Sequence, residues 1–158
     1  MLQSVEQQNR AAEAGRTCDP VSLEIIRGAI AAAQSEMEAL LERTAISAFI
    51  REKKDFYTAL FDADGVMAVG SMVPIFGDMT GPVLEAFPAD TMKPGDLYWY
   101  NDCYGSRGAV SHSNDQVLLA PVFQDGRRCA FVMSWAHFAD IGGIRPGSIS
   151  PDATEIFQ

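Results

Sequence analysis

The sequence is short of basic side chains. Among its 158 residues, 12 lysines and arginines stand against 21 aspartates and glutamates, which gives a formal net charge of -9. A nucleic-acid-binding surface needs clustered Lys and Arg to neutralise phosphates, and docking on anionic lipid has the same requirement. The charge balance therefore argues against both kinds of partner.

Cysteines are also few, and long apolar runs are missing. Cys18, Cys103 and Cys129 are odd in number and widely spaced, and no C-x-x-C occurs. A disulfide framework and a zinc ribbon are both excluded by this pattern. No apolar run reaches the length of a membrane span. The opening stretch MLQSVEQQNRAAEAG is polar and lacks the apolar core of a signal peptide. We therefore expect a cytoplasmic protein with reduced thiols and no membrane association.

The common nucleotide-binding and hydrolase motifs are missing as well. The strings G-x-x-x-x-G-K-[ST], G-x-G-x-x-G and G-x-S-x-G do not occur. The loop DIGGIRPGS offers backbone N–H groups of the kind that cradle anions, but it is not a P-loop. This chain alone therefore predicts no nucleotide site.

What the chain does contain is enough apolar sequence, 47%, for the core of one domain. Residues 1–18 are expected to form a flexible lead-in, and residues 19–158 the domain. Apolar residues recur at three- and four-residue steps from Val21 to Leu41, which predicts a long helix. Asp19 is the expected N-cap, with Pro20 at the first helical position.

Two β-hairpins are predicted after the helix. Strand-forming residues flank the turn Asp64–Gly65, and a second turn, Asp125–Gly126, interrupts DQVLLAPVFQDGRRCAFVMSWAHF. Between them, TGPVLEAFP predicts a short helix that ends at Pro88, and KPGDLYWYND a turn followed by a strand. The last residues, ADIGGIRPGSISPDATEIFQ, are expected to be loop. The predicted fold class is α+β, with one long N-terminal helix and antiparallel β-hairpins.

Both histidines of the chain occur in an H-x-x-D frame: SHSND contains His112 and Asp115, and WAHFAD contains His137 and Asp140. In an antiparallel pair, the start of one strand lies beside the end of the other. A turn centred on Asp125–Gly126 brings Asp115 within one residue of the position opposite His137, and it brings His112 close to both. The second hairpin therefore gathers two imidazoles and a carboxylate at its open end.

Two interpretations of this cluster remain open from the pattern alone. Two histidines and a carboxylate are a common catalytic metal site, suited to Zn, Mn, Fe or Co, and Asp140 can orient a metal-bound imidazole. The alternative is a pair of partly buried, hydrogen-bonded histidines, with aspartates nearby because the chain is acidic.

Other candidate residues are weaker on sequence alone. Asp55 stands at the mouth of the first hairpin, where the residues favour a solvated acid paired with Arg51 or Lys54. Cys103 can act as a nucleophile or ligand, although a free cysteine beside aromatics is more often packed. Arg107 can bind an anionic group or simply belong to the surface.

Four stretches, taken in order, carry a family resemblance: DPVSLEIIRGAI, RTAISAFIREKKDFYTALFDADG, MKPGDLYWYNDCYGSRGAVSHSND and SWAHFADIGGIRPGSISPDATEIFQ. Together they resemble the N-terminal part of the hydantoinase B/5-oxoprolinase family, over residues 19–158. That family includes subunits of N-methylhydantoinases, caprolactamase, and acetone and acetophenone carboxylases. The resemblance implies that the chain is part of a larger subunit fold.

The resemblance also implies a site and partners. It implies a divalent metal, Mn or Zn, held by Asp55, His112, Asp115 and His137, with catalytic roles for Asp55 and the two histidines. It further implies a hetero-oligomer with a hydantoinase A-like ATPase subunit, which binds ATP and activates a small-molecule substrate by phosphorylation. The implied reaction is hydrolysis of a cyclic amide; the alternatives are ATP-dependent carboxylation of a ketone and a non-catalytic assembly role.

Several features depart from the family pattern. Cys103 stands where family members often have proline, and SMVPIFGDMTGP lacks the histidines of the matching family stretch. Family members also continue beyond the point where this chain stops. We therefore expect a fragment or one piece of a split subunit.

Overall fold

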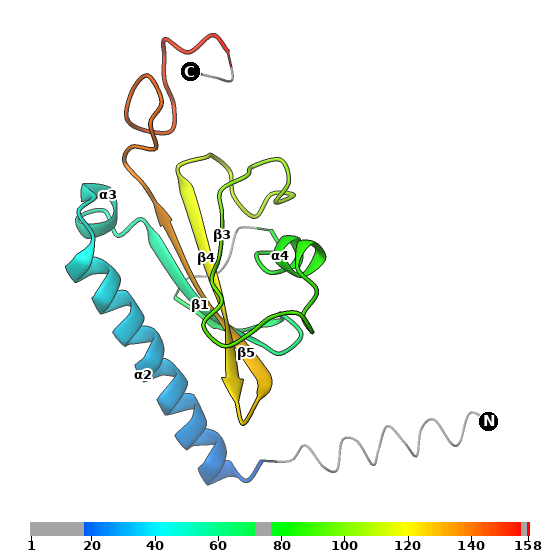
Figure 1. Cartoon of the computed structure of the whole chain (residues 1–158). Helices are drawn as coiled ribbons and strands as arrows, with labels where there is room; N and C mark the ends of the chain where they lie inside the picture. Colours follow the sequence, from blue (N-terminus) through cyan, green and yellow to red (C-terminus); the bar gives the residue numbers. More distant parts are fainter. Residues whose placement is uncertain (1–17, 72–76, 156–157) are drawn as a thin grey trace. The chain divides into compact units, whose positions relative to one another are not determined.

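The computed structural model describes residues 18–71, 77–155 and 158 (Figure 1). The chain divides into two compact units, residues 1–33 and residues 34–158. Of the first unit the structure describes residues 18–33, so the expected lead-in falls almost wholly outside the described residues.

The long predicted helix is confirmed as α2, Pro20–Thr44. Asp19 caps it as expected: its Oδ1 accepts hydrogen bonds from the backbone N–H groups of Val21, at 3.1 Å, and Ser22, at 3.0 Å. The apolar periodicity that predicts the helix is not matched by burial, since Val21 and Ile25 are 69% and 67% exposed. In the described part of the chain, no helix combines the length and apolar character needed to cross a membrane.

The remainder of the described chain is built on an antiparallel sheet with the strand order β2-β1-β5-β4-β3 (Figure 1). The strands are β1 (Phe56–Asp62), β2 (Met67–Gly70), β3 (Tyr98–Tyr100), β4 (Asp115–Gln124) and β5 (Arg127–His137). Two short helices, α3 (Ala48–Arg51) and α4 (Gly81–Ala86), complete the regular structure. The expected α+β class, with one long helix and antiparallel hairpins, is confirmed.

Both hairpins turn where the sequence predicts. In the first, Asp62 Oδ1 accepts hydrogen bonds from the backbone N–H groups of Asp64 and Val66, and Gly65 has a φ of 83°. In the second, Asp125 and Gly126 have φ values of 51° and 75°. Positive φ at both central residues is the backbone of a tight hairpin turn, which asparagine, aspartate and glycine accept most readily.

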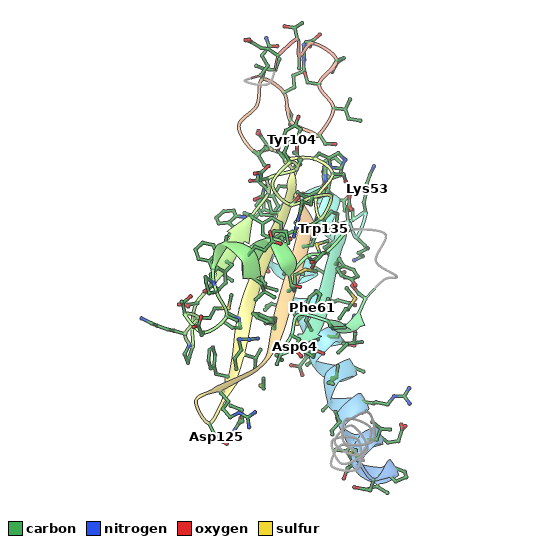
Figure 2. The ribbon with its side chains drawn as sticks, turned by 90° about the vertical axis from the view of Figure 1, so that its right-hand side faces the viewer. Lys53, Phe61, Asp64, Tyr104, Asp125 and Trp135 are labelled. Carbon is green, nitrogen blue, oxygen red and sulfur yellow. The ribbon has the colours of Figure 1, made fainter. Side chains whose placement is uncertain are left out.

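The hydrophobic core covers one face of the sheet. Alternate residues of a strand share a face, and the buried apolar residues follow that rule on the long strands: Tyr57, Ala59 and Phe61 on β1, Val117 and Leu119 on β4, and Phe131, Met133 and Trp135 on β5. Val83 of α4 packs against them. Figure 2 shows Phe61 and Trp135 along the sheet and Asp125 at the tip of the long hairpin.

Helix α4 confirms the short helix predicted in TGPVLEAFP. Asp78 Oδ1 accepts hydrogen bonds from the N–H groups of Thr80, at 3.1 Å, and Gly81, at 2.8 Å, so this carboxylate supports the start of the helix. Part of the stretch SMVPIFGDMTGP, which lacks the histidines of the family, falls on residues 72–76, outside the described residues.

Candidate metal centre

A β-bulge in the long hairpin determines which residues meet at its open end. Near the turn, Gln124 pairs with Arg127, as a turn at Asp125–Gly126 predicts. The register shifts by one residue between Val122 and Phe123, and from there to the open end the pairing is displaced. Asp115 therefore lies directly opposite His137, instead of opposite Ala136 as an uninterrupted ladder would place it.

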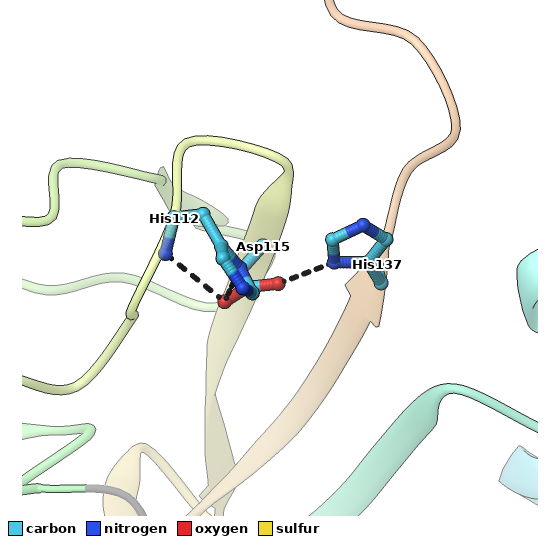
Figure 3. Close-up of side chains that lie close together, drawn as sticks. All are labelled: His112, Asp115 and His137. Carbon is cyan, nitrogen blue, oxygen red and sulfur yellow. Dashed lines mark hydrogen bonds and ion pairs between the residues drawn. The ribbon is translucent and has the colours of Figure 1, made fainter. Parts of the chain in front are cut away.

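The two histidines and Asp115 form one cluster (Figure 3). His112 Nδ1 lies 2.9 Å from Asp115 Oδ2, and His137 Nδ1 lies 2.8 Å from Asp115 Oδ1. The two imidazole ring centres are 5.2 Å apart, with an angle of 83° between the ring planes. His112 lies in the loop before β4, whereas Asp115 and His137 are the first residue of β4 and the last residue of β5.

Burial differs across the cluster. Asp115 is fully buried and His137 is 5% exposed, but the side chain of His112 is 41% exposed. A buried carboxylate is costly unless hydrogen bonds satisfy it. Besides the imidazoles, Asp115 Oδ2 receives the backbone N–H of His112, at 3.3 Å, and the N–H and hydroxyl of Ser111, at 3.3 and 3.4 Å. The cluster is therefore buried at Asp115 and open to solvent at His112.

The donor set fits a divalent transition metal. Each of the three side chains offers one ligand atom, and these atoms lie within 4.8 Å of one another. Two imidazole nitrogens with a carboxylate oxygen suit Zn, Mn, Fe or Co better than Ca or Mg, which prefer oxygen ligands. The same contacts also hold a metal-free, hydrogen-bonded trio together, and metal analysis separates the two interpretations.

Asp55 lies beside the cluster through its backbone. Its carbonyl oxygen accepts a hydrogen bond of 3.0 Å from the backbone N–H of His137. Among the described residues, the cluster whose ligand atoms lie within 4.8 Å of one another consists of the two histidines and Asp115, and the Asp55 carboxylate is outside it. Lys54, which the sequence suggested as a partner for Asp55, instead pairs with Glu42.

Asp140 does not take the orienting role that the sequence suggested. It is exposed, and its Oδ1 accepts a hydrogen bond of 2.8 Å from the backbone N–H of Gly142. The carboxylate that contacts both imidazoles is Asp115. The H-x-x-D spacing therefore brings the aspartate onto its own histidine in the first motif only. His112 lies in a loop that folds back over Asp115, whereas His137 ends a strand.

Cys103 and Arg107 have ordinary structural contacts. Cys103 is half-buried and packs against the core, with its Sγ 3.8 Å from Ser113 Oγ. The Arg107 guanidinium forms an ion pair of 3.0 Å with Glu85. These contacts favour the packing and surface interpretations of the two residues.

Several neighbours of the site were not among the sequence candidates. Phe49 of α3 packs edge-on against the His137 ring, with ring centres 5.4 Å apart. The side-chain amides of Asn101, Asn114 and Gln116 hold backbone carbonyls next to the histidines. Asn114 sits inside the SHSND motif, so extending the predicted ladder one residue past Asp115 would have found it.

The fold and the cluster together define a class: an α+β chain with a His–Asp–His site at the open end of a long hairpin. The sequence model of the hydantoinase B/oxoprolinase family matches residues 19–158. The chain belongs to this family, as the sequence motifs predict.

Within this family, the chain is similar in sequence to proteins with named activities. The chain is 33% identical over 150 residues to the caprolactamase subunit beta of Pseudomonas jessenii, covering 89% of this chain and 24% of that protein. It is 34% identical to 5-oxoprolinase 1 of Arabidopsis thaliana, covering 92% of this chain and 12% of that protein. The chain thus spans about a quarter or less of these relatives.

Solved structures share the fold. The crystal structure of the ATP-dependent caprolactamase from Pseudomonas jessenii matches with a TM-score of 0.74 at 33% identity, over 90% of this chain and 25% of that one. A nucleotide-free structure of acetone carboxylase matches with a TM-score of 0.66 at 19% identity, over 82% and 18% of the two chains. At that identity the second likeness concerns the fold alone.

Proposed function

We propose that this chain supplies the metal-binding part of an enzyme subunit that acts in the ATP-dependent hydrolysis of a cyclic amide. The observation that carries the proposal is the meeting of His112, Asp115 and His137 in a chain that is 33% identical to a caprolactamase subunit. Fold likeness alone does not assign an activity, so the argument depends on the site.

Under this proposal, His112, Asp115 and His137 hold a divalent metal, Mn or Zn, and Asp55 is the fourth ligand. Asp55 is supported by its backbone hydrogen bond to His137, which keeps it next to the cluster. When bound, such a metal polarises a carbonyl group and lowers the pKa of a bound water toward neutrality.

Residues in and next to the cluster have further roles in the proposed site. Asp115 supplies a buried negative charge that favours a cation, and its further hydrogen bonds fix its orientation. Phe49 packs against the ring of His137, which is 5% exposed. His112 forms the exposed side of the cluster, so a small substrate would approach there.

ATP would be used by a partner. The chain has no P-loop string, and its relative is named as one subunit of an ATP-dependent caprolactamase. We therefore propose a hetero-oligomer in which a hydantoinase A-like subunit binds ATP and phosphorylates a lactam carbonyl, and this subunit carries the hydrolytic site.

A second candidate is the ATP-dependent carboxylation of a ketone. It is supported by the stretch NDCYGSRGAVSHSND, which resembles that branch of the family. The higher identity to caprolactamase, 33% against 19%, favours the amide. A non-catalytic assembly role is the third possibility, and it predicts a metal-free chain.

Removing the central carboxylate tests the metal site. Asp115→Ala is expected to weaken binding of Mn or Zn by more than about 100-fold, because losing a direct ligand should exceed the roughly 10–100-fold cost of an outer-shell change. Metal content by mass spectrometry and affinity by titration measure this. Gln124→Ala, at an exposed position near the hairpin turn, is the matched control and should bind like the wild type.

The results separate the alternatives. A folded wild-type chain that takes up neither Mn nor Zn contradicts the metal site and supports the assembly role. Retention of the metal by Asp115→Ala equally contradicts the ligand assignment. Asp55→Ala is expected to weaken binding less than Asp115→Ala, because the Asp55 carboxylate lies outside the cluster of His112, Asp115 and His137.

Activity decides between the two reactions. The chain, together with an ATPase partner of the family, is supplied with ATP and either a lactam alone or a ketone with bicarbonate. We expect ATP-dependent ring opening of the lactam without bicarbonate. Product formed only from ketone and bicarbonate contradicts the amidohydrolase proposal and establishes the second candidate.

A further inference from the structure

We propose that Asn101 and Asn114 are positioning residues that hold the backbone of the two histidine-bearing segments in the geometry needed for metal binding. The inference rests on the proposed function of the cluster. It concerns a second layer of residues whose side chains do not touch a metal themselves.

Asn101 fixes the loop that carries His112. Its Nδ2 donates a hydrogen bond of 2.7 Å to the backbone carbonyl of Ser113, the residue directly after His112. Gln116 Nε2 donates to the same carbonyl at 2.8 Å. Gln116 is itself held by Trp99, whose indole N–H donates to Gln116 Oε1 at 2.6 Å. One carbonyl oxygen thus accepts two amide donors, one following β3 and one from β4.

Asn114 fixes the end of the strand that carries His137. Its Nδ2 donates a hydrogen bond of 2.7 Å to the carbonyl of Phe138, the residue directly after His137. In return, the backbone N–H of Phe138 donates to the Asn114 carbonyl at 2.9 Å. This reciprocal pair extends the contact of β4 and β5 one residue beyond the Asp115–His137 pair, and Asn114 is only 4% exposed.

The two anchors share a pattern. Each amide donates to the backbone carbonyl of the residue directly after a candidate ligand. Each therefore limits rotation of the backbone next to an imidazole. Binding sites need their ligands held to within about 0.5 Å by supporting residues. His112 has the greater need, because it lies in a loop and its side chain is 41% exposed.

The competing explanation is that the amides merely close the open end of the hairpin. Such a role predicts lower stability of the metal-free chain but an unchanged site in every molecule that folds. Cobalt(II) distinguishes the two explanations, because its visible absorption depends on the geometry of its ligands and its affinity is measured by titration.

The test uses the full chain with Asn101→Ala and Asn114→Ala, and Gln124→Ala as an amide control near the hairpin turn. We expect the dissociation constant for Co²⁺ to rise about 10–100-fold in the two asparagine variants, with a changed visible spectrum. Gln124→Ala should match the wild type in both. Thermal unfolding of the metal-free proteins is recorded in parallel to separate loss of structure from loss of the site.

The outcomes are distinct. Wild-type affinity and spectrum in both asparagine variants overturn the inference, whatever happens to the unfolding temperature. A wild-type chain that binds no Co²⁺ contradicts the proposed function and this inference with it. Asn114 is buried, so if Asn114→Ala does not fold, the half-buried Asn101 decides. Trp99 is 64% exposed, and Trp99→Phe should give a Co²⁺ affinity between those of the wild type and Asn101→Ala. Wild-type affinity in both Trp99→Phe and Asn101→Ala counts against the inference.

Discussion

Asp115 is the residue on which the candidate site depends. It is fully buried, yet each of its carboxylate oxygens faces a different imidazole. The sequence nominates His112, Asp115 and His137 because the chain has only two histidines and one hairpin joins them. It also nominates Asp140, and that was wrong, because the loop after β5 turns this carboxylate toward its own backbone.

A second residue gives a pH-dependent prediction. The Tyr100 hydroxyl donates a hydrogen bond of 2.7 Å to the carbonyl of Met79. Burial, and to a lesser extent the charge of Asp78, raises the pKa of Tyr100 well above its ordinary value. Because the folded-state pKa is the higher one, the stability that Tyr100 contributes is complete below the unfolded pKa of about 10 and is lost as the pH rises above it.

Wild-type stability should therefore fall more steeply above about pH 10 than that of Tyr100→Phe. Chemical unfolding at a series of pH values from neutral to strongly alkaline measures both slopes. The difference between the two proteins isolates this residue, since burial also raises the pKa of Tyr57. Parallel curves above pH 10 would show that Tyr100 ionises normally.

At the scale of elements, the local signals were the most reliable. The N-cap and N1 proline of α2, the two aspartate–glycine turns and the short helix α4 all lie where the sequence predicts. These signals are local because each depends on the φ angle or hydrogen-bonding capacity of one or two residues. The bulge between Val122 and Phe123 had no such signal, and it changes the partner of Asp115.

Two glycines provide a matched test of these backbone effects. A methyl group added at Gly126, which has a φ of 75°, or at Gly28, which lies within α2, would meet no heavy atom within 4 Å beyond its chain neighbours and, at Gly28, the backbone of its own helix. Gly126→Ala is expected to destabilise the protein by about 1–2 kcal/mol, because an L-residue is strained at positive φ. Gly28→Ala should instead stabilise the helix by about 0.5–1 kcal/mol.

Unfolding followed by circular dichroism measures the free energy of unfolding of both variants. Changes of the same sign would contradict the assignment of the two backbone conformations. Metal binding should be unaffected in both variants, because neither residue belongs to the cluster of His112, Asp115 and His137.

At the scale of the whole molecule, the stability of residues 34–158 depends on the apolar side chains that are buried on one face of the sheet. Phe131 and Leu119 are fully buried there, and α4 and the loops around it cover them. The candidate site lies at the end of this same face: Asp115 follows the alternation of Val117 and Leu119, and His137 follows that of Trp135. Packing of the core and alignment of the ligands are therefore linked.

Core truncation tests whether this face of the sheet is the core. Phe131→Ala is expected to cost about 3–5 kcal/mol, because it removes a buried ring and leaves a cavity. Ile149→Ala, at a side chain 84% exposed, should change stability by less than about 0.5 kcal/mol. Denaturant unfolding compares the two. Comparable losses in both variants would mean that this face of the sheet is not the core.

The amino-acid sequence by itself determined the long helix α2, the short helix α4, the two hairpins with their turns, and the family. These follow from periodicity, from turn residues and from ordered motifs, and each of these signals depends on residues close together in the sequence. Only the tertiary structure decided that Asp115 faces His137, that Asp115 rather than Asp140 contacts both rings, and that asparagine amides hold the flanking carbonyls. Those features depend on a one-residue shift of register and on loops folding back across strands, so they arise from contacts between residues distant in the chain.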